Sequence, residues 1–168
     1  MTLFEIEGRR QAMHAIEALR HYTPGCDGVR LRNFGMSIGI RDTRKIDAFY
    51  NMTEPDVRSE ARFEDSVGVY PEFIDGHGIL IIPITGRYMH IPYRSMLPKK
   101  IKNLIIAGRA IGGHKIAHAA TRNMACCAVT GQAAGVAAAL SVKNRCGFSD
   151  INLELMQTTL VSQGVRIK

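Results

Sequence analysis

The sequence predicts an α/β fold, and three observations carry this prediction. Apolar residues alternate with polar or small ones over Val29–Ile40, which is typical of one or two half-buried strands. A short continuous apolar run, Leu104–Ala107, ends at Gly108 and is typical of a buried parallel strand. A long helix is expected from about Asn123 to Val142. Strands and helices therefore both contribute to the expected core.

A helix is expected at the N-terminus, from Thr2 to about Arg20. Thr2 and Glu5, three residues apart, make a capping box. The helix should end before Thr23-Pro24-Gly25, which is a turn by composition. Apolar residues recur between these points at helical spacing, namely Ile6, Met13, Ile16 and Leu19.

A second capping box predicts a short helix in the middle of the chain. Thr53 is followed by Asp56, with Pro55 in the first turn, so the helix should run from Glu54 to about Arg62. A loop rich in glycine and aspartate should follow it.

A β-hairpin is expected after this loop. Gly78–Thr85 is apolar and β-branched, and Tyr88–Tyr93 alternates, so the two segments should pair around the turn Thr85-Gly86-Arg87. Pro83 would place its strand at an edge or a bulge.

A last helix is expected near the C-terminus. Ser149, Asp150 and Asn152 can each cap its start. The helix should run through Gln163, with Gly164 as the residue that ends it in a left-handed conformation.

The composition fits one soluble domain or a piece of a larger one. The chain has 168 residues, of which 46% are hydrophobic and 22% charged, and its net charge is +7. The positive charges are spread along the sequence without a basic stripe, so nucleic-acid binding is not expected. Apolar stretches such as Ile79–Ile84 and Val136–Leu140 are far shorter than the roughly 18 residues of a membrane span.

The N-terminus and the cysteines bear on the compartment. Met1–Glu7 contains two acids where a secretory signal has a basic region and an apolar run, so a cytoplasmic protein is expected. The cysteines contain no C-x-x-C pair, so neither a zinc site nor a disulfide framework is expected. Cys126 and Cys127 lie in a small-residue apolar run and are expected to be buried packing residues.

Two glycines lie inside the long helix, where each costs about 1 kcal/mol relative to alanine. Gly131 and Gly135 are four residues apart and so share one helix face with Ala134 and Ala138. Another backbone could approach such a face closely. We expect a strand or helix to pack there.

The start of the same helix is a candidate anion site. A helix N-terminus exposes unpaired N–H groups and carries about half a positive charge. Thr121 and Asn123 are good capping residues, and Arg122 adds a full charge between them, which suits an electron-rich oxygen or a phosphate. The alternative is an ordinary capped helix with a solvated arginine.

Six blocks of the chain follow one another in a specific order and spacing: Glu5–Arg10, Gly39–Ile46, Tyr88–Pro98, Asn103–Arg109, Arg122–Met124 and Thr130–Ala139. Together they resemble the C-terminal part of FAD-dependent oxidoreductases with the two-dinucleotide-binding-domain flavoprotein fold. This resemblance covers nearly the whole chain.

The resemblance implies a fold and a reaction. Residues 91–145 would be the C-terminal portion of an FAD-binding Rossmann-like domain. Residues 1–90 would be a β-rich substrate-side segment and residues 146–168 a helical tail. The implied reaction is hydride transfer to or from a small organic substrate, with the flavin as carrier. The implied cofactor-binding residues are Gly108, Arg109, Arg122, Asn123, Met124, Gly131 and Gln132.

One family feature is missing from the sequence. Related enzymes carry a G-x-G-x-x-G motif that holds the FAD pyrophosphate, and no such motif occurs in these 168 residues. The chain therefore looks like a fragment or a subunit that needs a partner chain or segment carrying this motif, and it should not hold FAD alone. The alternative is a non-catalytic subunit that completes or regulates a partner flavoprotein.

Three residues are candidates for catalysis. His114 and His118 follow Gly112-Gly113 in an expected loop that would border the flavin, and either could donate or accept a proton. Their spacing of four also suits a metal pair, but no third ligand lies nearby, so no metal is expected. Arg44 could hold a carboxylated substrate or a flavin phosphate, or it could be a solvated surface residue.

Two further residues come just before the expected final strand. Tyr93 and Arg94 follow Pro92, and this position places them close to a cofactor or a substrate in the fold that the resemblance implies.

Overall fold

The computed structural model of the chain describes residues 2–84 and 86–168, without the side chain of Thr2. The chain divides into two compact units, Met1–Arg41 and Asp42–Lys168, which we describe separately. The functional boundaries expected at residues 90 and 145 stay predictions.

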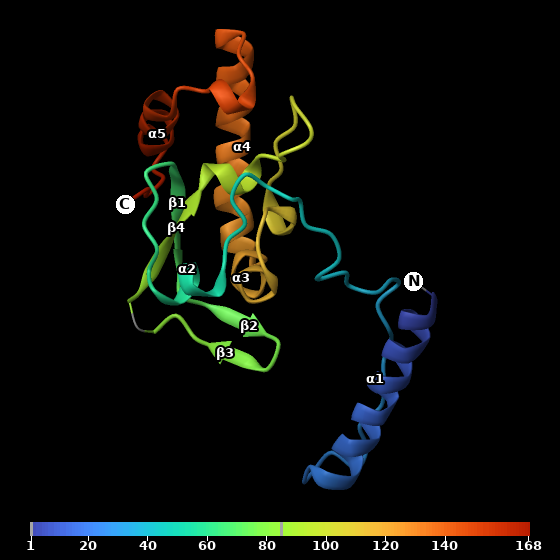
Figure 1. The fold of residues 1–168 in the computed structure, drawn as a ribbon. Coiled ribbons are helices and arrows are strands. Elements are labelled where there is room, and N and C mark those ends of the chain that lie inside the picture. The colour runs from blue at the N-terminus through green and yellow to red at the C-terminus, as the bar shows by residue number, and fades with distance from the viewer. Residues whose placement is uncertain (1, 85) are drawn as a thin grey trace. The chain divides into compact units, whose positions relative to one another are not determined.

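The first unit consists of a helix and an irregular segment. Helix α1 (Thr2–Tyr22) is confirmed, and it ends at the expected turn, where Gly25 has a left-handed φ of +80° (Figure 1). The capping box of Thr2 and Glu5 depends on a side chain outside the described part of the structure.

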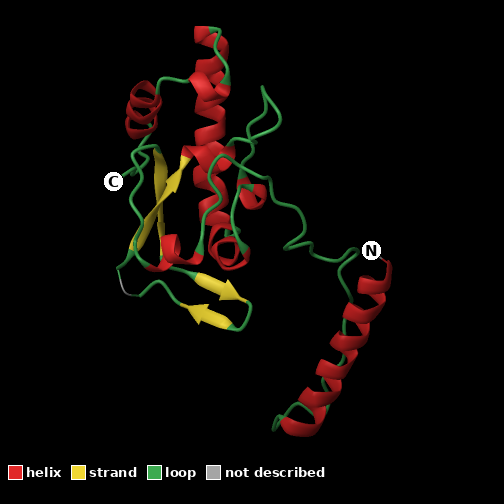
Figure 2. Ribbon diagram, viewed as in Figure 1, coloured by secondary structure: helices red, strands yellow, loops and turns green. Residues whose placement is uncertain are grey.

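The expected strands within Val29–Ile40 are wrong, because this segment contains no regular structure (Figure 2). A strand needs a hydrogen-bonded neighbour, and the described part of the first unit offers only a helix. The segment is held by side chains of α1 instead. Arg20 Nε donates to the Val29 carbonyl at 2.7 Å, and the Arg9 guanidinium lies 5.6 Å from the ring centre of Phe34.

The second unit contains two small antiparallel sheets. Strand β1 (Ser66–Pro71) pairs with β4 (Tyr88–Pro92), and strand β2 (Ile74–Gly76) pairs with β3 (Ile79–Ile81). In the sequence the hairpin β2–β3 lies between β1 and β4, but in space β1 and β4 pair directly and the hairpin forms a separate sheet (Figure 1).

This pairing corrects two expectations. The predicted hairpin between Gly78–Thr85 and Tyr88–Tyr93 does not form, because β3 and β4 belong to different sheets; Thr85 of its expected turn lies outside the described residues. The segment expected as a loop contains β1 and β2. The loop was predicted from the glycine and aspartate content of this segment, but Gly68 is buried in β1 and Asp75 lies within β2.

Helix α2 (Glu54–Arg58) begins as predicted. Its capping box is formed, and the Thr53 backbone N–H donates to Asp56 Oδ2 at 2.7 Å. The helix ends four residues earlier than expected. Glu60 has a left-handed φ of 55°, which a continuing helix cannot accommodate.

Helix α4 (Met124–Asn144) packs across β1 and confirms the expected long helix. Its buried residues include Cys126, Ala133 and Leu140. Among the described residues, α4 is the helix that is long and apolar enough to cross a membrane by length and composition alone. A core helix of a soluble protein passes the same test, and no clear membrane span follows from it.

Helix α5 (Leu153–Ser162) is capped at both ends as predicted. Asn152 Oδ1 accepts a hydrogen bond from the Leu155 N–H at 2.9 Å. At the other end Gly164 has a φ of +87°, and Val165 N donates to the Leu160 carbonyl at 3.0 Å. This bond pattern is the Schellman motif.

The expected buried parallel strand at Leu104–Ala107 is wrong. The segment is extended, and Ile106 N donates to the Met96 carbonyl at 2.9 Å, but no strand forms. A parallel strand needs parallel neighbours, and the described residues contain only one isolated parallel bridge, Met52 with Gly113. Helices with small antiparallel sheets therefore make the fold α/β only in a broad sense, and residues 2–84 and 86–168 form no Rossmann-like parallel sheet.

The expected loop around the two histidines is partly wrong. It ends at His114, and helix α3 (Lys115–Thr121) contains His118. Before it, Gly108–Ala110 forms a short 3-10 turn, η2. Gly112 allows the chain to fold tightly here, because a Cβ at this position would lie 2.5 Å from the Ala48 Cβ. Two further 3-10 turns are Tyr93–Met96 (η1) and Phe148–Asp150 (η3).

Candidate functional site

The turn η2, the helix α3 and the start of α4 lie together. Gly108 has a left-handed φ of +72°, and its N–H donates to Thr130 Oγ1 on α4 at 2.9 Å. Glycine adopts this conformation without strain. The bond fixes the position of η2, and with it Arg109, whose side chain is exposed.

The start of α4 lacks a side-chain cap. Asn123 occupies the N-cap position, but its side chain turns back toward α3, where Nδ2 donates to the Ala120 carbonyl at 2.8 Å. Among the described residues, the first turn of α4 therefore has no side-chain cap. Met124, the first helical residue, is 89% exposed. The N–H groups of this turn keep the capacity to bind an acceptor.

Arg122 links α3 to α4, and its guanidinium is turned toward the hairpin β2–β3. Nη2 donates to the backbone carbonyl of Asp75 on β2. Nε is buried and has no hydrogen-bond partner among the described residues. The residue thus joins three elements, and one of its donors remains unsatisfied.

His118 is the buried member of the predicted catalytic set, with 2% of its surface exposed. Its Nδ1 lies 3.5 Å from Oδ2 of Asp42, whose Oδ1 accepts from Lys45 Nζ at 2.7 Å. Burial lowers the pKa of His118, and the positive charge of Lys45 lowers it further, while Asp42 acts in the opposite direction. The hydrogen bond from Lys45 holds the pKa of Asp42 below its ordinary value.

The other two catalytic candidates are exposed. His114 is the N-cap residue of α3, and its carbonyl accepts the first helical hydrogen bond, from His118 N at 2.8 Å. Arg44 lies on the surface two residues after Asp42. Only His118 of the three lies in a buried polar environment.

The expected close approach of a backbone to Gly131 and Gly135 is wrong for this chain. Both residues are exposed, and a Cβ added to either would meet nothing within 4 Å. The side chain of Gln132 donates to Gln163 Oε1 after α5, at 2.9 Å. The opposite side of α4 packs on β1, so the glycines face away from the core.

The glycines belong to a larger exposed surface, which we call the open face of α4. It follows helical spacing and consists of small or apolar residues that are exposed in the described structure. Its members are Met124, Ala128, Gly131, Gly135, Ala139 and Val142.

Asp42 is the site residue that sequence reasoning missed. It lies in a polar segment beside Arg41 and Arg44, and neither a spacing nor a motif distinguishes it. Only the folded chain brings it next to His118, 76 positions later in the sequence. Its one available signal was its acidic charge within a basic block.

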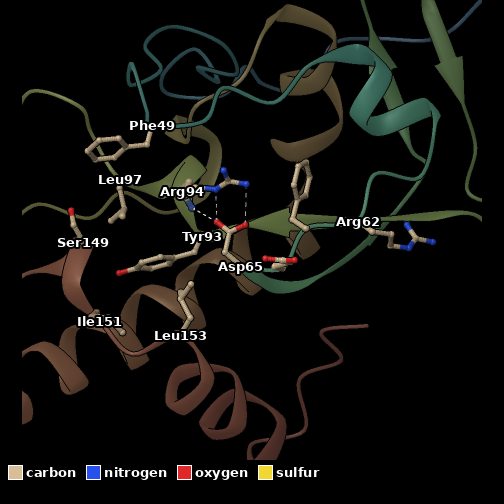
Figure 3. Close-up of a pocket in the computed structure, with 11 residues that line it drawn as sticks. Phe49, Arg62, Asp65, Tyr93, Arg94, Leu97, Ser149, Ile151 and Leu153 are labelled. Atoms are coloured by element: carbon tan, nitrogen blue, oxygen red, sulfur yellow. Dashed lines mark hydrogen bonds and ion pairs between the residues drawn. The ribbon is translucent and has the colours of Figure 1, made fainter.

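A cavity of about 620 Å³ lies elsewhere in the second unit (Figure 3). Figure 3 shows Arg94 and Asp65 pointing toward each other in its wall, and Arg94 Nε donates to Asp65 Oδ2 at 3.0 Å. Tyr93 lies beside them and donates through its hydroxyl to the Phe148 carbonyl at 3.0 Å. The remaining wall is mostly apolar, with Phe49, Phe63, Leu97, Ile151 and Leu153.

This cavity has the size of a small-molecule pocket. Tyr93 and Arg94, predicted to lie near a cofactor or a substrate, contribute to it. None of the seven expected cofactor-binding residues does. The cavity is therefore separate from the region where η2, α3 and the start of α4 meet. Gly108, Arg109, Arg122, Asn123 and Met124 lie in this region, Gly131 lies on the open face of α4, and Gln132 contacts Gln163.

Of the two neighbouring cysteines, Cys126 is buried as expected, whereas Cys127 is only partly buried. Cys126 is fully buried, and burial strongly raises the pKa of its thiol. Burial also raises the pKa of Cys127, against the positive charge of Arg109. Both side chains are therefore neutral thiols at neutral pH. No group of three or more His, Cys, Asp or Glu side chains that could hold a metal ion occurs among residues 2–84 and 86–168.

Comparison with known proteins identifies the family. A sequence model of the family described as FAD dependent oxidoreductase matches residues 1–160. No curated protein and no solved structure matches the chain. Because the family match covers nearly all of the sequence, the chain belongs to the FAD dependent oxidoreductase family, whose cofactor is FAD.

Proposed function

We propose that this chain supplies the ring-facing part of an FAD site in an enzyme that transfers hydride to or from a small organic substrate. The observation that carries the proposal is the uncapped start of α4. Asn123 turns its side chain away from the helix start, and no side chain in the described part of the chain caps the first-turn N–H groups.

The residues at this point fit the cofactor. A reduced flavin carries negative charge near N1 and C2=O, and a helix N-terminus with a nearby cation stabilises such charge. Arg122 supplies the cation, and its buried Nε has no hydrogen-bond partner within residues 2–84 and 86–168. FAD would contribute the hydride chemistry when bound, and the protein contributes position and charge.

The chain's own residues would divide the remaining tasks. Arg122, Asn123 and Met124 would hold the ring end of the cofactor, and the backbone at Gly108 and Arg109 would border it. His118 would accept or donate a proton beside the hydride transfer, which its burial and neutral form support.

Two exposed residues complete the proposed substrate contacts. His114 lies one turn before His118, and Arg44 follows Asp42 closely in sequence. An arginine can hold a carboxylate through two parallel hydrogen bonds. We propose that Arg44 binds an acidic group of the substrate and that His114 contacts the substrate as well.

The open face of α4 would be the surface on which the phosphate-binding part of the FAD site packs. The sequence has no G-x-G-x-x-G motif, and Gly131 and Gly135 leave the helix surface flat and exposed. A segment or partner chain that carries the motif would pack there and hold the FAD pyrophosphate. Gln132 would lie at the edge of this contact.

The test is a calorimetric FAD titration in two conditions. The chain alone should show weak or no binding, and the chain mixed with a G-x-G-x-x-G polypeptide from the same genome should show one bound FAD. Submicromolar binding by the chain alone would overturn the proposal of a missing half.

A matched pair of variants locates the contact. Gly131→Leu should prevent assembly without unfolding the chain, because its side chain would fill the proposed interface. Gly8→Leu places the same change on α1, where a Cβ also meets nothing within 4 Å, and should leave assembly intact. Equal assembly of both variants would argue against the open face of α4 as the contact.

A second candidate function is a non-catalytic subunit that completes a partner flavoprotein. The exposure of His114 and Arg44 favours it, since neither is held in a buried reactive environment. His118→Gln in the assembled, FAD-loaded enzyme distinguishes the two candidates. Catalytic participation predicts a large loss of turnover at full flavin occupancy, and a completing subunit predicts none.

A further inference from the structure

His118 has an unusual electrostatic environment for a buried histidine. Its Nδ1 is one of three buried side-chain atoms without a hydrogen-bond partner among the described residues; the others are Arg122 Nε and His90 Nε2. An unsatisfied buried polar atom costs free energy, and a protein retains it where the atom has a task.

The His118 ring faces the Asp42 carboxylate through an atom that makes no hydrogen bond. Nδ1 has no hydrogen-bond partner among the described residues, and it lies 3.5 Å from Asp42 Oδ2. A neutral imidazole carries one proton, and when that proton is on Nε2 the lone pair of Nδ1 faces the carboxylate.

This arrangement favours a second proton on the ring, and other groups oppose it. Burial and the charges of Lys45 and Arg122 lower the pKa of His118, while Asp42 and the Arg109 backbone raise it. These are the groups that face the ring from the segment before α2, from the end of α3 and from η2. Asp42 is the sole negative charge among them.

We propose that Asp42 is the positioning residue for proton transfer at His118, and that Nδ1 is the atom that accepts the proton. At 3.5 Å from Oδ2, Nδ1 makes no hydrogen bond among the described residues, and the carboxylate can hold the imidazolium once it forms. Lys45 Nζ, at 2.7 Å from the other oxygen, holds the Asp42 carboxylate in place and limits how far Asp42 raises the pKa of His118.

The step involves one proton and no change in oxidation state. The bond between the proton and its donor, either the substrate or water, breaks and leaves its electron pair on the donor. The proton joins the lone pair of Nδ1, and the ring gains one positive charge. The carboxylate of Asp42 stays ionised and pairs with it. Because the Asp42 side chain is 28% exposed, the pair also has contact with solvent, through which the proton can leave.

This inference rests on the proposed function for the use of the proton, but the coupling itself can be tested without flavin. The imidazole signals of the full chain are followed by NMR over pH, and the His118→Gln spectrum assigns the His118 signal. Asp42→Asn should lower the His118 pKa relative to the parent chain, because the sole opposing negative charge is lost. Lys45→Gln should raise it, because a cation is lost.

The control is Asp47→Asn. Asp47 is also an exposed aspartate paired with a lysine, at 2.8 Å from Lys99 Nζ, but it does not face His118. This variant should leave the His118 titration unchanged, and Asp42→Glu should restore most of it. An unchanged His118 pKa in Asp42→Asn, or shifts of equal sign in Asp42→Asn and Lys45→Gln, would overturn the proposal.

The outcome is separable from that of the proposed function. If the opposite shifts occur but His118→Gln keeps full turnover in the loaded enzyme, the pair exists and the catalytic role of His118 is wrong. If turnover depends on His118 while Asp42→Asn leaves both its pKa and the pH profile of the rate unchanged, the catalytic role holds and the role of Asp42 is wrong.

Discussion

Val129 on α4 fills the space that a side chain at position 68 would need. A Cβ placed on Gly68 of β1 would lie 2.4 Å from Val129 Cγ1, far inside van der Waals contact. Gly68 is buried, and the valine is β-branched and stiff in a helix. Because Gly68 has no side chain, β1 and α4 can pack closely at this point of the core.

Gly68→Ala should destabilise the chain by about 1–3 kcal/mol, the usual cost of overpacking. Urea unfolding followed by circular dichroism measures the change. Gly135→Ala is the control, because it adds the same methyl group to the open face of α4, where nothing lies within 4 Å. That variant should gain up to about 1 kcal/mol from helix propensity. Equal stability of the two variants would contradict the close contact.

Asn152→Ala should cost about 1 kcal/mol, because the Leu155 N–H loses its acceptor at the start of α5. Asn152→Asp keeps an oxygen in the same place and should retain the parental stability. Thermal unfolding of the three proteins checks this prediction. A loss of the same size in both variants would mean that some other property of the amide matters.

The stability of the chain should fall as the pH drops below about 6.5, the ordinary pKa of histidine. Burial lowers the pKa values of His118 and His90 in the folded state, so below this pH the unfolded chain binds more protons than the folded one. Unfolding at pH 7.5 and pH 5.5 measures the effect. His118→Gln should reduce the difference, whereas His14→Gln on the surface of α1 should not.

Arg122→Ala should loosen the hairpin β2–β3 even without flavin. The carbonyl of Asp75 loses the donor from Nη2, and Gly76, whose Cβ would lie 2.9 Å from that nitrogen, loses its contact. Hydrogen exchange of the amides in Ile79–Ile81 should become faster. Arg109→Ala removes a neighbouring exposed arginine and serves as the control. If hydrogen exchange in Arg122→Ala were unchanged, the contact of Arg122 with β2 would not stabilise the hairpin, and the positive charge would be its remaining contribution.

Helices could be predicted from this sequence because their signals are local. The capping box at Thr53, the cap at Asn152 and the left-handed glycine at position 164 each depend on residues within one or two turns. All three occur in the structure. The end of α2 could not be predicted, since the turn at Glu60 is set by contacts with later strands.

Strands could not be predicted to the same extent, because a strand exists only with its neighbour. Leu104–Ala107 has the composition of a buried strand but no partner among the described residues. The partner of β1 is β4, and the residues between them form a hairpin of their own. The alternation of apolar residues shows which segments can be extended and not which ones pair.

The candidate site was predicted in part. The helix start at Asn123 follows from sequence reasoning, but the orientation of the Asn123 amide, the burial of His118 and its pairing with Asp42 depend on the packed chain. Arg122 was expected at the helix start, and its guanidinium instead contacts β2.

The hairpin β2–β3 is closed at its base. The Glu72 N–H donates to the Arg87 carbonyl at 3.0 Å, and an ion pair of 3.4 Å joins their side chains. Since Glu72 and Arg87 are already held together, changing the length of the chain between them changes the entropy of loop closure only a little. This part of the molecule can therefore diverge between homologous proteins, by insertion or deletion, while the sheet of β1 and β4 that supports α4 keeps its register.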